Sequence, residues 1–319
     1  MASSNRPNRS RRPSRRQSSP SQKSPSKQKR SPRQQRPVAG RSGRGRGAGR
    51  GGASASPGPG PESRGRRSDL GGEQVEGRQA VRELLLAGRR RTRTVMIAEG
   101  LEQAPILDDI IELAREQRAA VREVPRRELE AAARSDAPQG VVALADPLPS
   151  KELSDLARPL PPAHGSAERA PFLLVLDGIT DPGNFGAVLR TAECAGVSGV
   201  VLPRHRAARV TATAAKAAAG AVEHLDFAVV PGIPAALRDL SSHDVWTVGL
   251  DPAAPRPLHE LDLASEAVAL VLGAEGRGLS RLASERCDVL ASIPLRGALG
   301  SLNVAAAAAV ACFDIARRR

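Results

Sequence analysis

Three glycine-rich loops in the second half of this 319-residue chain carry the polar residues best suited to chemistry. Each follows an apolar run typical of a buried strand, and their sequences are DGITDPGN (177–184), GAEGRGLS (273–280) and IPLRGALGSLN (293–303). In open α/β sheets ligands bind at the carboxyl ends of the strands, so three such loops predict one shared site. Taken singly, each loop has an ordinary structural explanation, since DPGN is a common turn and Ser301 is a preferred helix N-cap residue.

Residue spacing argues against two other kinds of site. The segment GAEGRG (273–278) has the pattern G-x-x-G-x-G, and no acid occupies a clear ribose-binding position about 20 residues later, so a nucleotide-dependent oxidoreductase is not expected. The cysteines Cys194, Cys287 and Cys312 lie far apart without a C-x-x-C pair, and the five histidines lack metal-ligand spacing. We therefore expect no metal site and no disulfide framework, as is typical of a reducing compartment.

The elements that position the three loops alternate between strands and helices. Strands are expected at 172–176, 199–203, 226–230, 245–250, 267–273 and 289–294, and helices near 184–195, 211–220, 234–241, 279–286 and 301–318. Because the strands are continuous apolar runs, this alternation predicts a parallel sheet with helices on both faces.

A smaller α/β unit is expected before this sheet. The stretch GGEQVEGRQAVRELLLAG (71–88) reads as an entry into a helix that stops at Gly88, and strands are expected at 94–98, 121–124 and 140–145, separated by helices over 104–120 and 126–135. Six prolines within 147–171 indicate an interdomain linker. The arginines of RRRTR, at positions 89, 90, 91 and 93, are candidates for phosphate contacts, and a solvated loop explains them equally well.

The positive charge of the chain is concentrated in its first 67 residues. These contain 19 Lys and Arg against one acid, whereas residues 68–319 contain 29 bases against 33 acids, so the net charges are +18 and −4. Such a Ser/Arg/Pro/Gly-rich tail buries too little apolar surface to fold. Its RGRGAGRGG run (44–52) is similar to RGG-type RNA-binding tails, with a solubilising extension as the alternative. A transit peptide is disfavoured because no periodic apolar face is present.

Together the three loops resemble motifs 1, 2 and 3 of the SpoU/TrmH family of RNA 2′-O-methyltransferases, in the SPOUT superfamily. The motifs are DGITDPGNFGAVLRTAECAG (177–196), LVLGAEGRGLS (270–280) and SIPLRGALGSLNVAAAAAV (292–310). Residues 73–145, with VEGRQAVRELL near the start and PQGVVAL near the end, are similar to the substrate-binding domain of the RlmB-like branch.

The resemblance implies an α/β fold with a parallel-sheet catalytic domain and a C-terminal trefoil knot, preceded by a small α/β substrate-binding domain. The implied division is a disordered basic tail over 1–72, an RNA substrate-binding domain over 73–146, a Pro-rich linker over 147–171 and the knotted methyltransferase domain over 172–319. The implied cofactor is S-adenosyl-L-methionine, bent and held largely by backbone groups, without a metal. Its implied binding residues are Gly273, Ile293 and Leu302, with Leu272, Ala274 and Pro294 shaping the pocket.

The resemblance also implies the catalytic residues, which are Asn184, Arg190, Glu275, Ser301 and Asn303. A guanidinium is a very poor base, with a pKa above ~12. We therefore expect Arg190 to grip the substrate phosphate and to stabilise developing alkoxide charge, while the phosphate or a water takes the proton. Asn184 is expected to cap its helix and orient Arg190, and Glu275 to pair with that network.

The resemblance implies methylation of a guanosine in 23S rRNA by a cytoplasmic homodimer, whose partner approaches the alanine-rich last helix (303–316). A tRNA substrate and a non-catalytic RNA-binding protein that kept the fold are the alternatives. The simplest tRNA-acting members lack a leading domain such as 73–146, which favours rRNA. The folded part has five aromatic residues and no tyrosine, so we expect RNA to be held by arginines and shape rather than by stacking platforms. No apolar run approaches the ~18 residues of a membrane span.

Overall fold

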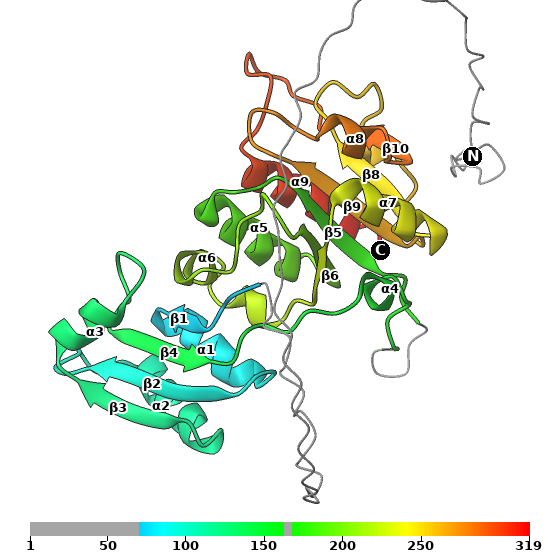
Figure 1. The fold of residues 1–319 in the computed structure, drawn as a ribbon. Coiled ribbons are helices and arrows are strands. Elements are labelled where there is room, and N and C mark those ends of the chain that lie inside the picture. Colours follow the sequence, from blue (N-terminus) through cyan, green and yellow to red (C-terminus); the bar gives the residue numbers. More distant parts are fainter. Residues whose placement is uncertain (1–69, 163–167) are drawn as a thin grey trace, which may run out of the picture. The chain divides into compact units, whose positions relative to one another are not determined.

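The computed structural model describes residues 70–162 and 168–319 (Figure 1). The basic tail, including its RGG-like run, lies outside these residues except for positions 70–72. Those three positions are part of the packed structure, because Leu70 is buried and Gly71 forms a β-bridge with Val210. Within the described ranges, no helix has the length and apolarity needed to cross a bilayer.

A four-stranded sheet lies in the first part of the described chain. Its order is β1-β4-β2-β3, with bounds Gln74–Glu76 (β1), Val141–Ala145 (β4), Thr92–Ala98 (β2) and Ala120–Val124 (β3). Strand β2 pairs in parallel with β3 and antiparallel with β4. Strand β1, which the sequence did not predict, pairs antiparallel with β4.

Alternate residues of β2 face two small cores. Val95 and Ile97 pack with helices α1 (Arg78–Ala87) and α2 (Pro105–Glu116), whereas Met96 and Ala98 pack with α3 (Arg126–Ala132). This is the two-residue alternation of a strand with both faces covered. Helix α1 ends as predicted at Gly88, which takes the left-handed conformation with φ 56°.

The second sheet has six strands, all parallel, in the order β10-β8-β9-β5-β6-β7. The bounds are Phe172–Asp177 (β5), Gly199–Pro203 (β6), Phe227–Val230 (β7), Trp246–Leu250 (β8), Val268–Gly273 (β9) and Val289–Ala291 (β10). The order reverses between β5 and β9, because β6 follows β5 on one side while β9 lies on the other. That reversal marks the place where open α/β sheets bind ligands.

Helices cover both faces of this sheet, as predicted (Figure 1). One face packs against α5 (Pro182–Cys194), α6 (Ala212–Ala217) and α9 (Val304–Ala316), and the other against α4 (Leu153–Leu156), α7 (Ile233–Ser242) and α8 (Arg281–Ser284). The 3-10 turns η2 (Ala221–Glu223) and η3 (Leu258–Glu260) complete the described elements. Strand β5 serves both cores, since Leu174 and Leu176 face the first and Leu173 and Val175 the second.

Two helices begin at residues that the sequence did not predict. Helix α5 begins at Pro182, and its N-cap is Asp181, whose carboxylate accepts the Asn184 backbone N–H at 2.6 Å. The expectation that Asn184 caps α5 is wrong, because proline is pre-organised for the first helical position. Helix α9 begins at Val304 rather than at Ser301, because the Asn303 side chain is its N-cap.

The proline-rich segment between the sheets is packed along part of its length. The side chains of Leu148 and Leu156 are buried, and the Lys151 backbone N–H donates to the Phe227 carbonyl at 2.7 Å. Helix α4 therefore belongs to the cover of the second sheet. Residues 163–167 lie outside the described part.

Three of the RRRTR arginines form ion pairs, and one of these, Arg90, is buried. Arg90 is neither a solvated residue nor a phosphate contact, because its side chain is 3% exposed and forms a two-point ion pair with Glu223, itself 1% exposed, at 2.6 and 2.9 Å. Its remaining nitrogen donates to the carbonyls of Gly72 and Asp146. Arg89 pairs with Asp226. Arg91 and Arg93 are exposed, and Arg93 pairs with Asp146 at 3.7 Å.

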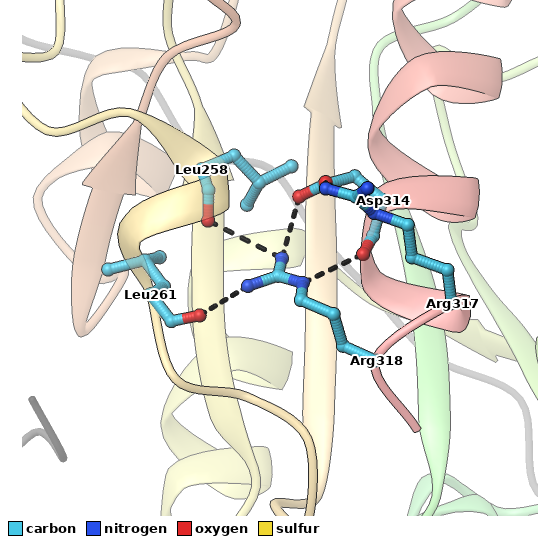
Figure 2. Close-up of polar contacts among 5 residues, drawn as sticks. All are labelled: Leu258, Leu261, Asp314, Arg317 and Arg318. Carbon is cyan, nitrogen blue, oxygen red and sulfur yellow. Dashed lines mark hydrogen bonds and ion pairs between the residues drawn. The ribbon is translucent and has the colours of Figure 1, made fainter. Parts of the chain in front are cut away.

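The C-terminal end of α9 is fixed to the segment that connects β8 and β9. Figure 2 shows the Arg318 guanidinium between α9 and this segment. It donates to the carbonyls of Leu261 at 2.5 Å and Leu258 at 3.5 Å and pairs with Asp314 at 2.7 Å. Arg317 pairs with the other oxygen of Asp314 at 2.7 Å. The last turn of the helix is thereby attached to η3.

Candidate active site

Three polar side chains from three separate segments meet at the carboxyl edge of the second sheet. Asn184 lies in the first turn of α5, Glu275 follows β9, and Asn303 caps α9. The Asn184 amide nitrogen donates to Glu275 Oε2 at 2.9 Å. The Asn303 amide nitrogen donates to Asn184 Oδ1 at 3.0 Å and to Glu275 Oε1 at 3.3 Å. The structure therefore brings together three of the five residues expected to be catalytic.

The cap of α9 fixes the orientation of these amides. The Asn303 Oδ1 accepts the backbone N–H of Ala305 at 2.8 Å, so its amide nitrogen must face Asn184 and Glu275. Asn184 then presents its oxygen to Asn303 and its nitrogen to Glu275. Each carboxylate oxygen of Glu275 accepts one donor, close to the N-terminal turns of α5 and α9, where the helix dipoles favour negative charge.

A cavity of about 160 Å³ adjoins this cluster. It lies at the carboxyl ends of β8, β9 and β10 and includes five of the six expected donor-binding residues together with Glu275 and Ser301. Its lining residues are Leu250, Pro252, Leu272, Gly273, Ala274, Glu275, Gly276, Gly278, Ile293, Leu295, Ser301, Leu302, Val304 and Ala307. Pro294, the sixth expected residue, is exposed and is not among them.

Two lining residues that the sequence analysis missed come from β8. Leu250 ends that strand and Pro252 follows it. The strand itself was predicted, and its parallel neighbours β9 and β10 carry two of the three loops. The rule that ligands bind beyond the carboxyl ends of adjacent strands would have included the loop after β8.

The loop after β9 folds back tightly on itself and leaves backbone at the cavity. The Ala274 and Gly278 backbones exchange two hydrogen bonds, at 3.0 and 2.8 Å. A Cβ on Gly273 would lie 2.1 Å from the Gly278 carbonyl carbon and 2.2 Å from the Leu279 nitrogen, so only glycine is possible there. With Leu272 and Ile293 beside it, the cavity offers apolar side chains and accessible backbone, which suits a ligand recognised mainly by shape and main-chain groups.

Arg190 is positioned differently from the cluster. It follows Asn184 by six residues, which on a helix of 3.6 residues per turn places it on another face of α5. Its side chain is exposed, and it makes no hydrogen bond or ion pair with any residue that the structure describes. Ser301 lies at the cavity. The described residues contain no group of three His, Cys, Asp or Glu side chains that could hold a metal ion.

Comparison with known proteins identifies the family. The chain matches the model of the SpoU rRNA Methylase family over residues 171–313 and that of RNA 2′-O ribose methyltransferase substrate binding over residues 74–150. The 23S rRNA (guanosine-2′-O-)-methyltransferase RlmB of Pseudomonas aeruginosa is 40% identical over 247 residues, which are 77% of this chain and 97% of that protein. The chain belongs to the SpoU family.

Two further proteins are similar to this chain. The putative TrmH family tRNA/rRNA methyltransferase YacO of Bacillus subtilis is 35% identical over 247 residues, 77% of this chain and 96% of YacO. The crystal structure of an AdoMet-bound rRNA methyltransferase from Sinorhizobium meliloti is 26% identical, with a TM-score of 0.62 over 77% of this chain and 86% of that chain. The mixed α/β architecture with a parallel sheet is therefore that of SpoU proteins.

Proposed function

We propose that the chain transfers the methyl group of S-adenosyl-L-methionine to a ribose 2′-hydroxyl of RNA, at a guanosine of 23S rRNA. One observation supports this most strongly. Asn184, Glu275 and Asn303, which the SpoU resemblance names as catalytic, are hydrogen-bonded to one another beside a cavity lined by residues that it names as donor-binding. The substrate is suggested by RlmB of Pseudomonas aeruginosa, whose name specifies a guanosine of 23S rRNA.

The proposed donor site is the cavity beyond β8, β9 and β10. The donor supplies an electrophilic methyl group on a sulfonium. The backbone at Gly273 and Ile293 would bind its polar edges, and Leu302 would cover it. Leu302 suits that role because its side chain remains 41% exposed beside the cavity, so it can be buried by a ligand. Leu272, Ala274 and Pro294 would shape the surrounding walls.

The proposed acceptor site adjoins the Asn184–Glu275–Asn303 cluster. The Glu275 carboxylate holds both amides in place and leaves lone pairs for the incoming ribose, while Ser301 lies at the cavity with a hydroxyl that can bind substrate. The exposed guanidinium of Arg190 would grip a substrate phosphate and stabilise charge on the reacting oxygen. The phosphate or a water, rather than Arg190, would accept the proton, because a guanidinium is too weak a base.

We propose that the C-terminal region forms a trefoil knot. The support is a set of contacts between the chain after β10 and the connection between β8 and β9. The Ser292 backbone N–H donates to the Arg256 carbonyl and its carbonyl accepts the Leu258 N–H, both at 2.9 Å. Helix α9, which follows, is attached to the same connection by Arg318.

We also propose that the chain forms a homodimer. Helix α9 presents Ala306, Val310 and Phe313 at helical spacing on its outer side, and Val310 and Phe313 remain 48% and 49% exposed. Such an apolar stripe next to the site suits a second copy of the chain.

We further propose a separate role for each part of the chain. Residues 73–146 would bind the RNA, residues 147–171 would join the two parts, and residues 172–319 would carry the chemistry in the cytoplasm, where ribosomal RNA is modified.

The test is methyl transfer by wild-type protein and by Arg190→Ala, with tritiated S-adenosyl-L-methionine and separate rRNA and tRNA fractions. Wild type should label rRNA, and Arg190→Ala should lose the activity while binding the donor normally in equilibrium dialysis. Arg238→Ala, an exposed arginine on α7 across the sheet, is the matched control and should be fully active. Labelling of tRNA alone would favour the tRNA alternative, and an inactive wild type that binds RNA would favour the non-catalytic one. Full activity in Arg190→Ala would refute the assigned role.

A further inference from the structure

We propose that the loop between β6 and α6, residues 204–209, binds RNA phosphates next to the target nucleotide. The inference rests on the proposed function in so far as RNA is the substrate. It assigns a positioning surface to residues outside the three loops already described. The loop sequence is RHRAAR, with arginines at positions 204, 206 and 209.

The position of the loop is the first argument. Strand β6 pairs in parallel with β5, so the loop after β6 leaves the sheet at the same edge as the loop that leads to Asn184. The two loops touch, since the Ala208 backbone N–H donates to the Ile179 carbonyl at 2.8 Å. Both Ala208 and Ile179 are buried, which fixes the neighbouring polar residues of each loop relative to the other.

The order of strands places this loop in line with the site. Along the carboxyl edge of the sheet lie the donor cavity at β8, β9 and β10, then the polar cluster at β9 and β5, then the basic loop at β6. Neighbouring strands are about 4.8 Å apart, so β6 lies roughly 10 Å from β9. A strand of RNA with one ribose at the cluster would therefore have a flanking phosphate near the loop.

The charge of the loop is the second argument. Residues 195–222 contain three arginines, one lysine and no acid, although residues 68–319 as a whole carry a surplus of acids. The facing loop 177–184 contains two acids, and each accepts a backbone N–H, Asp181 from Asn184 and Asp177 from Ser280. The segment therefore carries a net positive charge of its own, and a ribose–phosphate backbone is the polyanion that the proposed reaction brings to this edge.

Arg206 is the residue best placed to make the contact. It is exposed, and its guanidinium forms no hydrogen bond or ion pair with any residue of the described ranges. Its backbone is held in the left-handed region, with φ 59°, which is uncommon for arginine. Arg209 closes the loop by donating to the Arg204 carbonyl at 3.1 Å. The loop thus holds Arg206 outward at the cost of an unfavourable backbone conformation, as functional loops often do.

The basic surface continues towards the first sheet. Lys216 of α6 lies close to Gly77, because a Cβ on that glycine would be 3.7 Å from Lys216 Cγ and 3.1 Å from Gln139 Oε1. Arg78 is bonded to the same Gln139 through its backbone N–H at 3.1 Å and through its Nε at 3.2 Å to the carbonyl. A phosphate backbone that leaves the loop therefore meets further positive charge on the proposed RNA-binding part.

The test compares Arg206→Asn with Arg206→Lys. Asparagine tolerates a positive φ and removes the charge, whereas lysine keeps the charge and, like arginine, disfavours that φ. The probe is a 23S rRNA transcript, and its affinity is measured by filter binding from low to moderate salt. One lost phosphate contact reduces the slope of log K against log salt by about 0.7 and weakens binding about fivefold at about 0.1 M salt. We expect this for Arg206→Asn, with KM raised and kcat at saturating RNA unchanged, and near-normal binding for Arg206→Lys.

Two controls separate this inference from the proposed function. Arg238→Asn, on the opposite face of the sheet, should leave affinity and slope unchanged. S-adenosyl-L-methionine binding should be equal in all variants. An inactive wild type would overturn the proposed function while the binding comparison could still succeed. If Arg206→Asn binds the transcript with wild-type affinity and salt slope, or if it lowers kcat alone, the inference about the loop is wrong.

Discussion

Loss of the Arg90–Glu223 ion pair should destabilise the protein far more than loss of a surface pair of the same length. Both side chains are almost fully buried, at 3% and 1% exposure, and are joined at two points. Glu223→Gln keeps the shape but leaves the Arg90 charge without its counter-charge in a buried site, which typically costs about 3–5 kcal/mol. In domains of about 150–250 residues each kcal/mol lowers Tm by about 2–4 °C, so a decrease of roughly 6–20 °C is expected.

The assay is urea unfolding followed by circular dichroism, with a thermal scan on the same samples. Glu285→Gln is the matched control, because Arg281 and Glu285 are also 2.6 Å apart but are 77% and 54% exposed. That variant should lose no more than about 0.5 kcal/mol. The double variant Arg90→Met with Glu223→Leu should lose less than the sum of the two single variants, since no unpaired charge remains. A loss below about 1 kcal/mol in Glu223→Gln would refute the reasoning, because it would mean that water reaches the pair.

Three further predictions concern the site and the thiols. Asn303→Asp should keep the cap of α9 and most of the stability of the protein. It should nevertheless abolish methylation, because it replaces an amide donor by a second carboxylate beside the cluster. Asn303→Ala should abolish methylation and also lower the free energy of unfolding in urea by about 1 kcal/mol, because it removes the cap. Gly273→Ala should abolish S-adenosyl-L-methionine binding in equilibrium dialysis, because its Cβ would collide with the backbone of Gly278; normal binding would contradict the tight fold of that loop. Burial raises the pKa of the Cys312 thiol to about 12, so it should remain a thiol between pH 7 and 9 and resist iodoacetamide until the protein unfolds. Cys194 is exposed, and partial burial of its thiol together with a hydrogen bond to Glu193 raises its pKa. It should therefore be alkylated faster at pH 9 than at pH 7, as measured by peptide mass spectrometry.

The architecture of the second sheet was predictable because its strands are short apolar runs between turn residues. The FLLVL run became β5, and its side chains face both cores, as a buried parallel strand requires. Strand β1 escaped prediction because three residues are too few to show a periodicity. The start of α5 was misplaced because Asn184 and Asp181 are both good capping residues, and only the backbone conformation decides between them.

The loops of the candidate site were predictable, and five of the six residues expected to bind the donor line the cavity, but the contacts among the polar residues were not predictable. Parallel strands bring the loops of Asn184, Glu275 and Asn303 to one edge, and the resemblance named these residues. The hydrogen bonds among them depend on side-chain orientation, which the sequence does not record. The role of Arg90 could not be predicted either, because its partner Glu223 lies 133 residues away along the chain.

The attachment of the last helix through Arg318 has a consequence for how this protein can vary. The guanidinium contacts main-chain oxygens of residues 258 and 261, not their side chains (Figure 2). Other apolar residues could replace both leucines without weakening the hydrogen bonds to Arg318. An insertion or deletion of a single residue would instead move both oxygens out of register with α9. We therefore expect the residue types of this segment to vary among related proteins while its length stays constant.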